Sequence, residues 1–101
     1  YKLEGDVIRV EGHTDDVPMG KKIKYSNNWE LSVARATNVG VFMIEKNGYD
    51  PDLISITGHA DTRPRISYTS ETGQRKLGKM LKEARKANRR VDLIFARPDA
   101  S

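Results

Sequence analysis

A short pattern of residues occurs twice in this chain, 46 positions apart. Residues 7–18 and 53–64 align without gaps, and the identical positions are Ile8/Ile54, Gly12/Gly58, His13/His59, Asp15/Asp61 and Pro18/Pro64. In both copies, apolar and polar residues alternate before the glycine and a polar loop follows it, which indicates a strand that ends in a loop. We therefore expect similar strands over residues 7–11 and 53–57, each followed by a loop that begins Gly-His.

The segment between the two copies has the signals of a helix. Asn27 is followed three residues later by Glu30, which is the spacing of a capping box. Asn47-Gly48 supplies the glycine on which helices commonly end. Within this helix we expect Trp29 and Phe42 to be core or helix-packing residues rather than surfaces for a ligand. A strand, a helix and a similar strand form a right-handed parallel unit, so both Gly-His loops should leave the same edge of the sheet.

The C-terminal part supplies one more helix and one more strand. Residues 65–72 are rich in Ser and Thr and read as a loop. From Gly73 onward the apolar positions have helical spacing, and they are Leu77, Met80/Leu81, Ala84 and Ala87. Residues 91–95 form a third strand. The predicted fold class is α/β (α+β), with a mixed β-sheet, a βαβαβ core and helices packed on the sheet, in a single domain over residues 1–101.

Composition narrows the classes of partner. The chain carries 18 Lys and Arg against 14 Asp and Glu and contains no Cys, so a disulfide scaffold and a thiolate metal site are excluded. Its basic residues gather in one segment, at Arg75, Lys76, Lys79, Lys82, Arg85, Lys86, Arg89 and Arg90. A nucleic-acid binder of this size usually adds stacking aromatics, and only Phe95 follows Tyr68. We expect a solvated helix face and no nucleic-acid partner, with attraction to anionic surfaces as the alternative.

Two charged residues lie on consecutive elements. Asp15 follows the end of the first strand, and Arg35 lies two turns into the helix. Because the helix packs back on the sheet, Arg35 can reach the loop that carries Asp15. Arginine binds a carboxylate with two parallel hydrogen bonds and aspartate accepts from an ammonium group, so a zwitterionic ligand would satisfy both. The alternative is an internal Asp15–Arg35 salt bridge of little functional consequence.

Several motifs occur in an order that resembles one family. They are Gly12-His13-Thr14-Asp15, then Asn28, then Leu31-Ser32 with Arg35-Ala36 and Val39, and finally Asn88-Arg89-Arg90-Val91. This order resembles the OmpA-like peptidoglycan-binding domain. The extension over residues 15–18 and the sequence of residues 26–32 look most like its flagellar-stator branch, the MotB-like domains. The resemblance runs from about Val7 to Phe95.

The resemblance implies both a ligand and the residues that bind it. In the family, the matching Asp and Arg hold the diaminopimelate of the peptidoglycan stem peptide, and the matching Asn helps to form the pocket. One of two adjacent arginines supports the pocket, and the sequence leaves open which of the two does so. The peptidoglycan-binding residues carried over in this way are Thr14, Asp15, Asn28, Arg35, Arg89 and Arg90.

The resemblance also implies a cellular role. The expected function is non-enzymatic anchoring of a MotB-like flagellar motor stator to the cell wall, without a cofactor or a metal. The chain would be the periplasmic domain of a bacterial inner-membrane protein. It would work as a homodimer, with a MotA-like partner bound through a transmembrane part outside this chain. We expect a fragment that lacks an upstream strand and helix and the transmembrane helix. The alternative within binding is an OmpA- or Pal-type anchor of the outer membrane.

An enzymatic alternative rests on the two Gly-His loops. His13 and Asp15 are two residues apart, as are His59 and Asp61. In an extended backbone such pairs point to one face, so the two loops could offer two imidazoles and two carboxylates to a metal ion. The hypothesis is a metal-dependent hydrolase. The family resemblance implies no metal there, and loop histidines often bond to nearby carbonyl groups instead.

Overall fold

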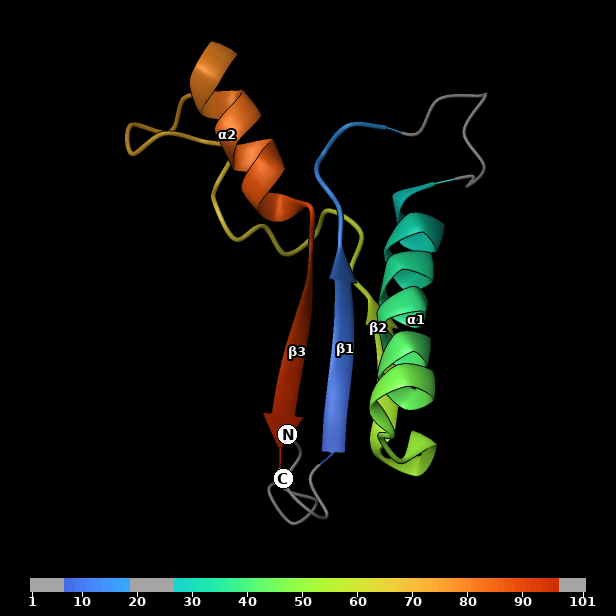
Figure 1. Cartoon of the computed structure of the whole chain (residues 1–101). Helices are drawn as coiled ribbons and strands as arrows, with labels where there is room; N and C mark the ends of the chain where they lie inside the picture. Colours follow the sequence, from blue (N-terminus) through green and yellow to red (C-terminus); the bar gives the residue numbers. More distant parts are fainter. Residues whose placement is uncertain (1–6, 19–26, 97–101) are drawn as a thin grey trace.

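The computed structural model describes residues 7–18 and 27–96, which form a three-stranded sheet and two α-helices (Figure 1). The elements in chain order are β1 (Val7–His13), α1 (Asn28–Asn47), the short 3-10 helix η1 (Pro51–Leu53), β2 (Ile54–Gly58), α2 (Gly78–Asn88) and β3 (Arg90–Ala96). The strand order is β2-β1-β3, with β1 parallel to β2 and antiparallel to β3. This mixed α and β architecture confirms the predicted fold class.

The sequence repeat is also the register of the parallel strands. In the β1–β2 pair, Ile8 lies opposite Ile54 and Gly12 lies opposite Gly58. The 46-residue spacing of the repeat therefore equals the offset between paired residues. Since both strands run in the same direction, equivalent residues of the two loops leave the sheet side by side. This register brings the two Gly-His loops together, as expected.

The first helix begins and ends where the sequence predicts. The Asn27 side chain accepts a hydrogen bond from the backbone N–H of Glu30 at 2.9 Å, and the helix ends at Gly48, whose φ of 72° is left-handed. The expected core positions of Trp29 and Phe42 are wrong, because these side chains are 53% and 57% exposed. The face of α1 that meets the sheet is instead formed by four other residues, which are Ser32, Ala36, Gly40 and Met43.

Small residues allow α1 to lie very close to the strands. A Cβ atom added at Gly12 would lie 1.9 Å from the backbone oxygen of Ser32. A Cβ at Gly58 would lie 2.5 Å from Cγ2 of Val33. The core beneath the helix is built from four buried residues, Ile8, Val10, Ala36 and Met43. The glycine in each copy of the repeat is therefore required by the close approach of α1.

The second helix lies beyond the ends of β1 and β2, whereas α1 lies along the sheet (Figure 1). It begins at Gly78, later than the expected start at Gly73, because residues 69 and 75 pair in an isolated antiparallel bridge. Asn88, at its C-terminal end, is fully buried. Its Oδ1 accepts from the backbone N–H groups of Arg65 and Ile66 at 2.7 and 2.9 Å. Asn88 thus fastens the 65–72 loop to the end of α2.

No helix in the described part of the chain combines the length and apolar character needed to cross a membrane. The predicted strands at 7–11, 53–57 and 91–95 are all present, each extended or shifted by one or two residues.

The contact at Gly12 leads to a stability prediction. Gly12→Ala places a methyl group against backbone that cannot move away without shifting α1, so we expect the free energy of unfolding to fall by about 3 kcal/mol or more. The matched control is Gly40→Ala. There the close contact of the added Cβ is with Cδ1 of Ile56 at 2.6 Å, the end of a flexible side chain, and its other neighbours lie at ordinary contact distances. Alanine also favours the helix by up to about 1 kcal/mol. Urea denaturation should rank Gly12→Ala far below Gly40→Ala. Equal midpoints and slopes would contradict the close approach.

Candidate ligand-binding site

The loops that follow β1 and β2 are joined directly to each other. The backbone N–H of Thr14 donates to the carbonyl of Ala60 at 2.8 Å, and Thr14 and Ala60 are both buried. The Thr14 hydroxyl donates to the carbonyl of Asp15 at 2.9 Å. Thr14 is therefore a structural part of the loop, and it fixes the backbone from which Asp15 projects.

Asp15 forms an ion pair across the site. Its Oδ2 accepts from Nη1 of Arg89 at 2.8 Å, and its Oδ1 accepts from the backbone N–H of Val17 at 3.0 Å. The Asp15 side chain is 14% exposed and that of Arg89 is 44% exposed. Of the two adjacent arginines, Arg89 is thus the one that contacts Asp15.

Arg90 has a different set of partners. Its Nε donates to both carboxylate oxygens of Asp92 at 3.2 and 3.0 Å, and its Nη2 donates to the carbonyl of Arg63 at 3.2 Å. Its side chain is only 16% exposed. These contacts fasten the start of β3 to the loop after β2.

Arg35 lines a hollow between α1 and the junction of α2 and β3. The hollow has a volume of about 430 Å³, and its lining residues are Arg35, Asn38, Arg89, Arg90 and Val91. Among the described residues, Arg35 forms no ion pair, and Asp15 is bound to Arg89 instead. The alternative of an internal Asp15–Arg35 salt bridge is therefore not realised. The guanidinium group of Arg35 remains available to a ligand.

Asn28, in the first turn of α1, holds the loop after β1. Its Nδ2 donates to the carbonyl of Val17 at 3.1 Å and, more weakly, to that of Asp15 at 3.4 Å. The amide therefore positions the backbone on either side of Asp16. The structure brings Thr14, Asp15, Asn28 and Arg89 into one connected set, with Arg35 beside Arg89 in the hollow.

Asp16 is a contributor that the sequence reasoning missed. Its two oxygens accept from Nε of Arg85 at 2.7 Å and from Nη2 of Arg75. Burial acts to raise the pKa of Asp16, but the hydrogen bonds from Arg85 and Arg75 outweigh it and hold that pKa below its ordinary value. The signal was present as an acidic pair, Asp15-Asp16, in a chain with one basic segment.

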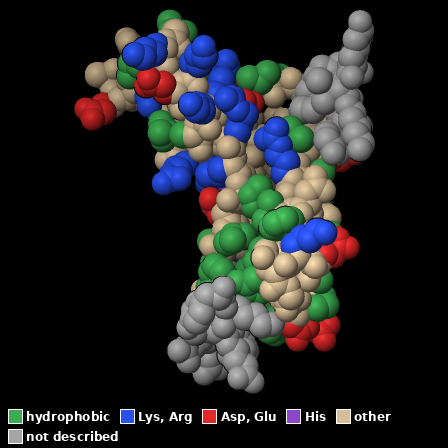
Figure 2. All heavy atoms as spheres, viewed as in Figure 1, with side chains coloured by type: hydrophobic (Ala, Val, Ile, Leu, Met, Phe, Trp, Pro, Cys, Tyr) green, Lys and Arg blue, Asp and Glu red, His purple; other side chains and the backbone are tan. Residues whose placement is uncertain are grey.

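Lys and Arg side chains gather over α2 and the adjoining residues, at the end of the molecule that holds this site (Figure 2). Arg75, Arg85 and Arg89 are bound to the Asp15-Asp16 pair. The basic segment is thus only partly a solvated face, because three of its arginines, on α2 or flanking it, bind the loop after β1.

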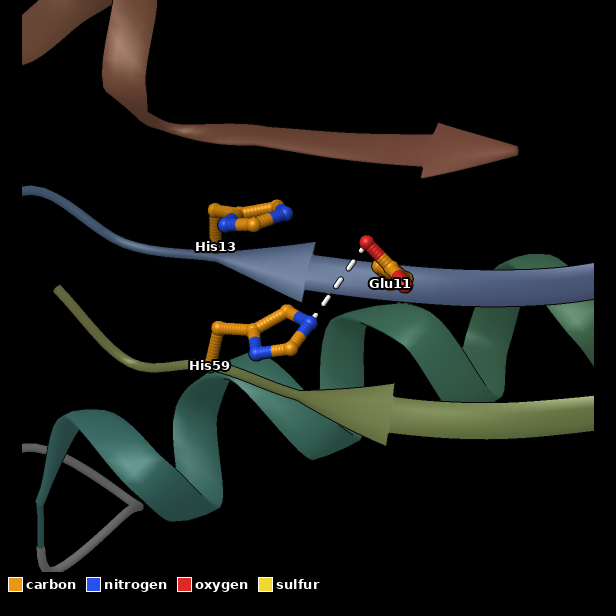
Figure 3. Close-up of side chains that lie close together, drawn as sticks. All are labelled: Glu11, His13 and His59. Atoms are coloured by element: carbon orange, nitrogen blue, oxygen red, sulfur yellow. Dashed lines mark ion pairs between the residues drawn. The ribbon is translucent and has the colours of Figure 1, made fainter. Parts of the chain in front are cut away.

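The four residues considered for a metal-dependent hydrolase do not assemble. His13 and His59 are stacked, with ring centroids 5.0 Å apart. Asp15, however, is bound to Arg89, and Asp61 is exposed. The carboxylate grouped with both imidazoles is that of Glu11, on β1 (Figure 3), and Oδ2 of Asp92 lies 3.4 Å from Nε2 of His13.

Comparisons with known proteins identify relatives of the chain. Motility protein B of Bacillus subtilis (strain 168) is 32% identical over 88 residues, which are 87% of this chain and 29% of that protein. The uncharacterised protein YtxE of the same organism is 34% identical over 87% of this chain and 31% of its own length. The chain thus spans about a third of the length of these two relatives.

Solved structures show the same fold. The periplasmic domain of Helicobacter pylori MotB superposes with a TM-score of 0.74 and 27% identity, over 96% of this chain and 52% of that one. The cell wall anchor of the type VI secretion system from Pseudomonas aeruginosa gives a TM-score of 0.68 and 32% identity, over 93% and 57%. The OmpA family matches residues 2–78. On this evidence the chain is a member of the OmpA family, with MotB periplasmic domains among its relatives.

Proposed function

We propose that this chain binds peptidoglycan noncovalently and anchors a MotB-like flagellar stator to the cell wall. The family membership supports this role, as do a motility protein of Bacillus subtilis and a cell wall anchor of Pseudomonas aeruginosa among the similar proteins. The observation that carries the proposal is the guanidinium of Arg35, which has no ion-pair partner among residues 7–18 and 27–96 and shares a hollow with Arg89, the partner of Asp15.

The chemistry of the site suits a zwitterionic amino acid. A ligand carboxylate would be bound by Arg35, which has no competing partner among the described residues, with Arg89 as a second cation beside it. The ligand ammonium group would be bound by the carboxylate of Asp15, which already holds Arg89 at 2.8 Å. Diaminopimelate of the stem peptide has both groups. Thr14 and Asn28 shape the loop backbone around Asp15, and Arg90 holds β3 in place next to the hollow.

The proposed setting follows from the relatives. The chain would be one peptidoglycan-binding domain of a longer inner-membrane protein, located in the periplasm, and its transmembrane part would bind a MotA-like partner. An OmpA- or Pal-type outer-membrane anchor is the alternative within the family. The non-enzymatic interpretation is the one that the relatives support, since their names describe motility proteins and anchors.

Loss of Arg35 is the sharpest test of the site. We expect Arg35→Ala to weaken co-sedimentation with purified peptidoglycan sacculi by at least tenfold, because truncating one partner of a charged contact costs about 2–5 kcal/mol. The fold should be unchanged, since Arg35 forms no ion pair within the described part of the chain. Asp15→Ala should also weaken binding. This variant also breaks the ion pair with Arg89, however, so it is a less specific test of the site.

The matched control for this experiment is Arg63→Ala. Arg63 is exposed, and only its backbone carbonyl is used, by Arg90. The Arg63→Ala substitution removes the same charge from outside the hollow. It should leave sacculus binding within twofold of the unaltered chain. If Arg35→Ala and Arg63→Ala bind alike, Arg35 does not bind the ligand.

The salt dependence of sacculus binding distinguishes binding in the hollow from binding on the basic face of α2. A partly enclosed contact at Arg35 is screened less than exposed charge, so binding should weaken only modestly from low to physiological salt. A polyanion held by α2 would instead give a steep salt slope. We expect Lys79→Glu/Lys82→Glu/Lys86→Glu to retain most sacculus binding at physiological salt. Loss of binding in this triple variant, with Arg35→Ala unaffected, would assign the function to the basic face.

We also propose that the domain pairs with a second copy through the α2 end. The structure exposes apolar side chains there: Ile66 is 40% exposed, Met80 57% and Leu77 74%. A hollow of about 700 Å³ lies beside them, and its lining residues are Ser67, Thr69, Ser70, Glu71, Thr72, Lys76 and Met80. A two-fold contact would bury these side chains against their equivalents.

Light scattering tests this pairing. The unaltered chain should show a concentration-dependent dimer, and Leu77→Lys should shift it to monomer, because a charge would be buried at the contact. Phe42→Lys is the control, since Phe42 is similarly exposed but lies on α1. A monomer at every concentration, or equal dimerisation of both variants, would show that α2 is not the interface.

A further inference from the structure

A second group of chemically active side chains lies on the other face of the sheet. Gly12 faces α1, as its close approach to Ser32 shows. Because side chains alternate along a strand, Glu11 and His13 point to the opposite face. His59, next after the end of β2, lies beside His13, and Figure 3 shows the three side chains converging.

Three of the four imidazole nitrogens of this group lack a hydrogen-bond partner in the described part of the chain. The His13 side chain is only 3% exposed, and neither of its ring nitrogens has a partner among the described residues. The same is true of Nε2 of His59, whose side chain is 13% exposed. The nearest carboxylate oxygens, of Asp92 and Glu11, lie 3.4 and 3.5 Å away without hydrogen-bond geometry. Buried polar atoms without a partner are rare in native proteins, which suggests that a ligand satisfies these.

We propose that His13, His59 and Glu11 form a binding site for Zn²⁺. The ion would join β1 to the end of β2. Two imidazoles and one carboxylate are a donor set that zinc uses in proteins. Harder cations such as Ca²⁺ prefer sites built wholly from oxygen atoms.

The geometry needs only small adjustments to bind the ion. One ligand atom from each of the three residues lies within 4.8 Å of the other two. Ligands around tetrahedral zinc are about 3.4 Å apart, given zinc–nitrogen distances of about 2.1 Å. Side-chain rotations that move the ligand atoms by about an ångström would close this difference. The carboxylate is already oriented, because Nε of Arg9 donates to Oε2 of Glu11 and leaves Oε1 facing His59.

The surroundings favour the neutral imidazole that a metal requires. Burial and then the nearby charge of Arg90 lower the pKa of His13 below its ordinary value. A lowered pKa favours the neutral ring, the form that can offer a lone pair to a cation. The charge of Arg90 is itself offset by Asp92, with which it forms two hydrogen bonds.

Calorimetric titration with zinc chloride tests the site. The 101-residue chain, without a histidine tag and stripped with a chelator, should bind one Zn²⁺ and no Ca²⁺. His59→Gln and Glu11→Gln should each weaken zinc binding by at least tenfold, with circular dichroism to verify folding. Asp61→Asn is the matched control. It alters an exposed carboxylate two residues from His59, outside the three ligands, and should bind zinc like the unaltered chain.

Two further measurements detect zinc binding without relying on the heat of binding. The chain contains only two histidines, so zinc should shift both sets of imidazole NMR resonances and no other histidine can contribute. Zinc should also raise the Tm by several degrees, since it binds the folded state preferentially, and His59→Gln should abolish the rise. Absence of binding, or an affinity of Glu11→Gln and His59→Gln equal to that of the unaltered chain, would overturn the proposal. Loss of affinity in Asp61→Asn alone would place the ion elsewhere.

Discussion

The parallel pairing of β1 and β2 is the constraint on which the rest of this structure depends. Its register sets Gly12 opposite Gly58, and both glycines lie under α1. The close contact of the helix with both strands fixes where each following loop begins. One pairing thus determines two surfaces: the loop with Asp15 on one side, and the His13–His59 pair on the other face.

The fold was largely predictable because its signals are local or repeated. The Asn27 cap and the Gly48 stop need only neighbouring residues, and they set the limits of α1 correctly. The 46-residue repeat supplied long-range information that a single sequence seldom contains, since it predicted the parallel pair and the meeting of the two loops. The exposure of Trp29 and Phe42 was not predictable in this way. Which stripe of a helix is buried depends on how close the strands come, and small residues decide that here.

The sequence named the members of the candidate site but not their pairings. Sequence motifs identified Asp15, Arg35 and the Arg89-Arg90 pair, but a motif does not say which guanidinium contacts which carboxylate. The answer depends on where α2 lies beyond the sheet, and no periodicity encodes that placement. For a similar reason, the sequence did not indicate that Glu11 lies next to the two histidines. Its position within a strand gave it the appearance of an ordinary polar residue on a sheet face.

The ion pairs between the first loop and the α2 region have a consequence for the entropic cost of folding. They join residues 59, 69 and 74 positions apart in the chain, whereas the β1–α1–β2 unit is closed by contacts 46 positions apart. Contacts between distant residues form against a larger loss of chain entropy. The helix-covered strand pair therefore closes at a slightly lower cost in chain entropy than the ion pairs that hold the α2 region to the first loop. Because β3 follows α2 directly and pairs with β1, the C-terminal end of α2 is also joined to the sheet through the backbone.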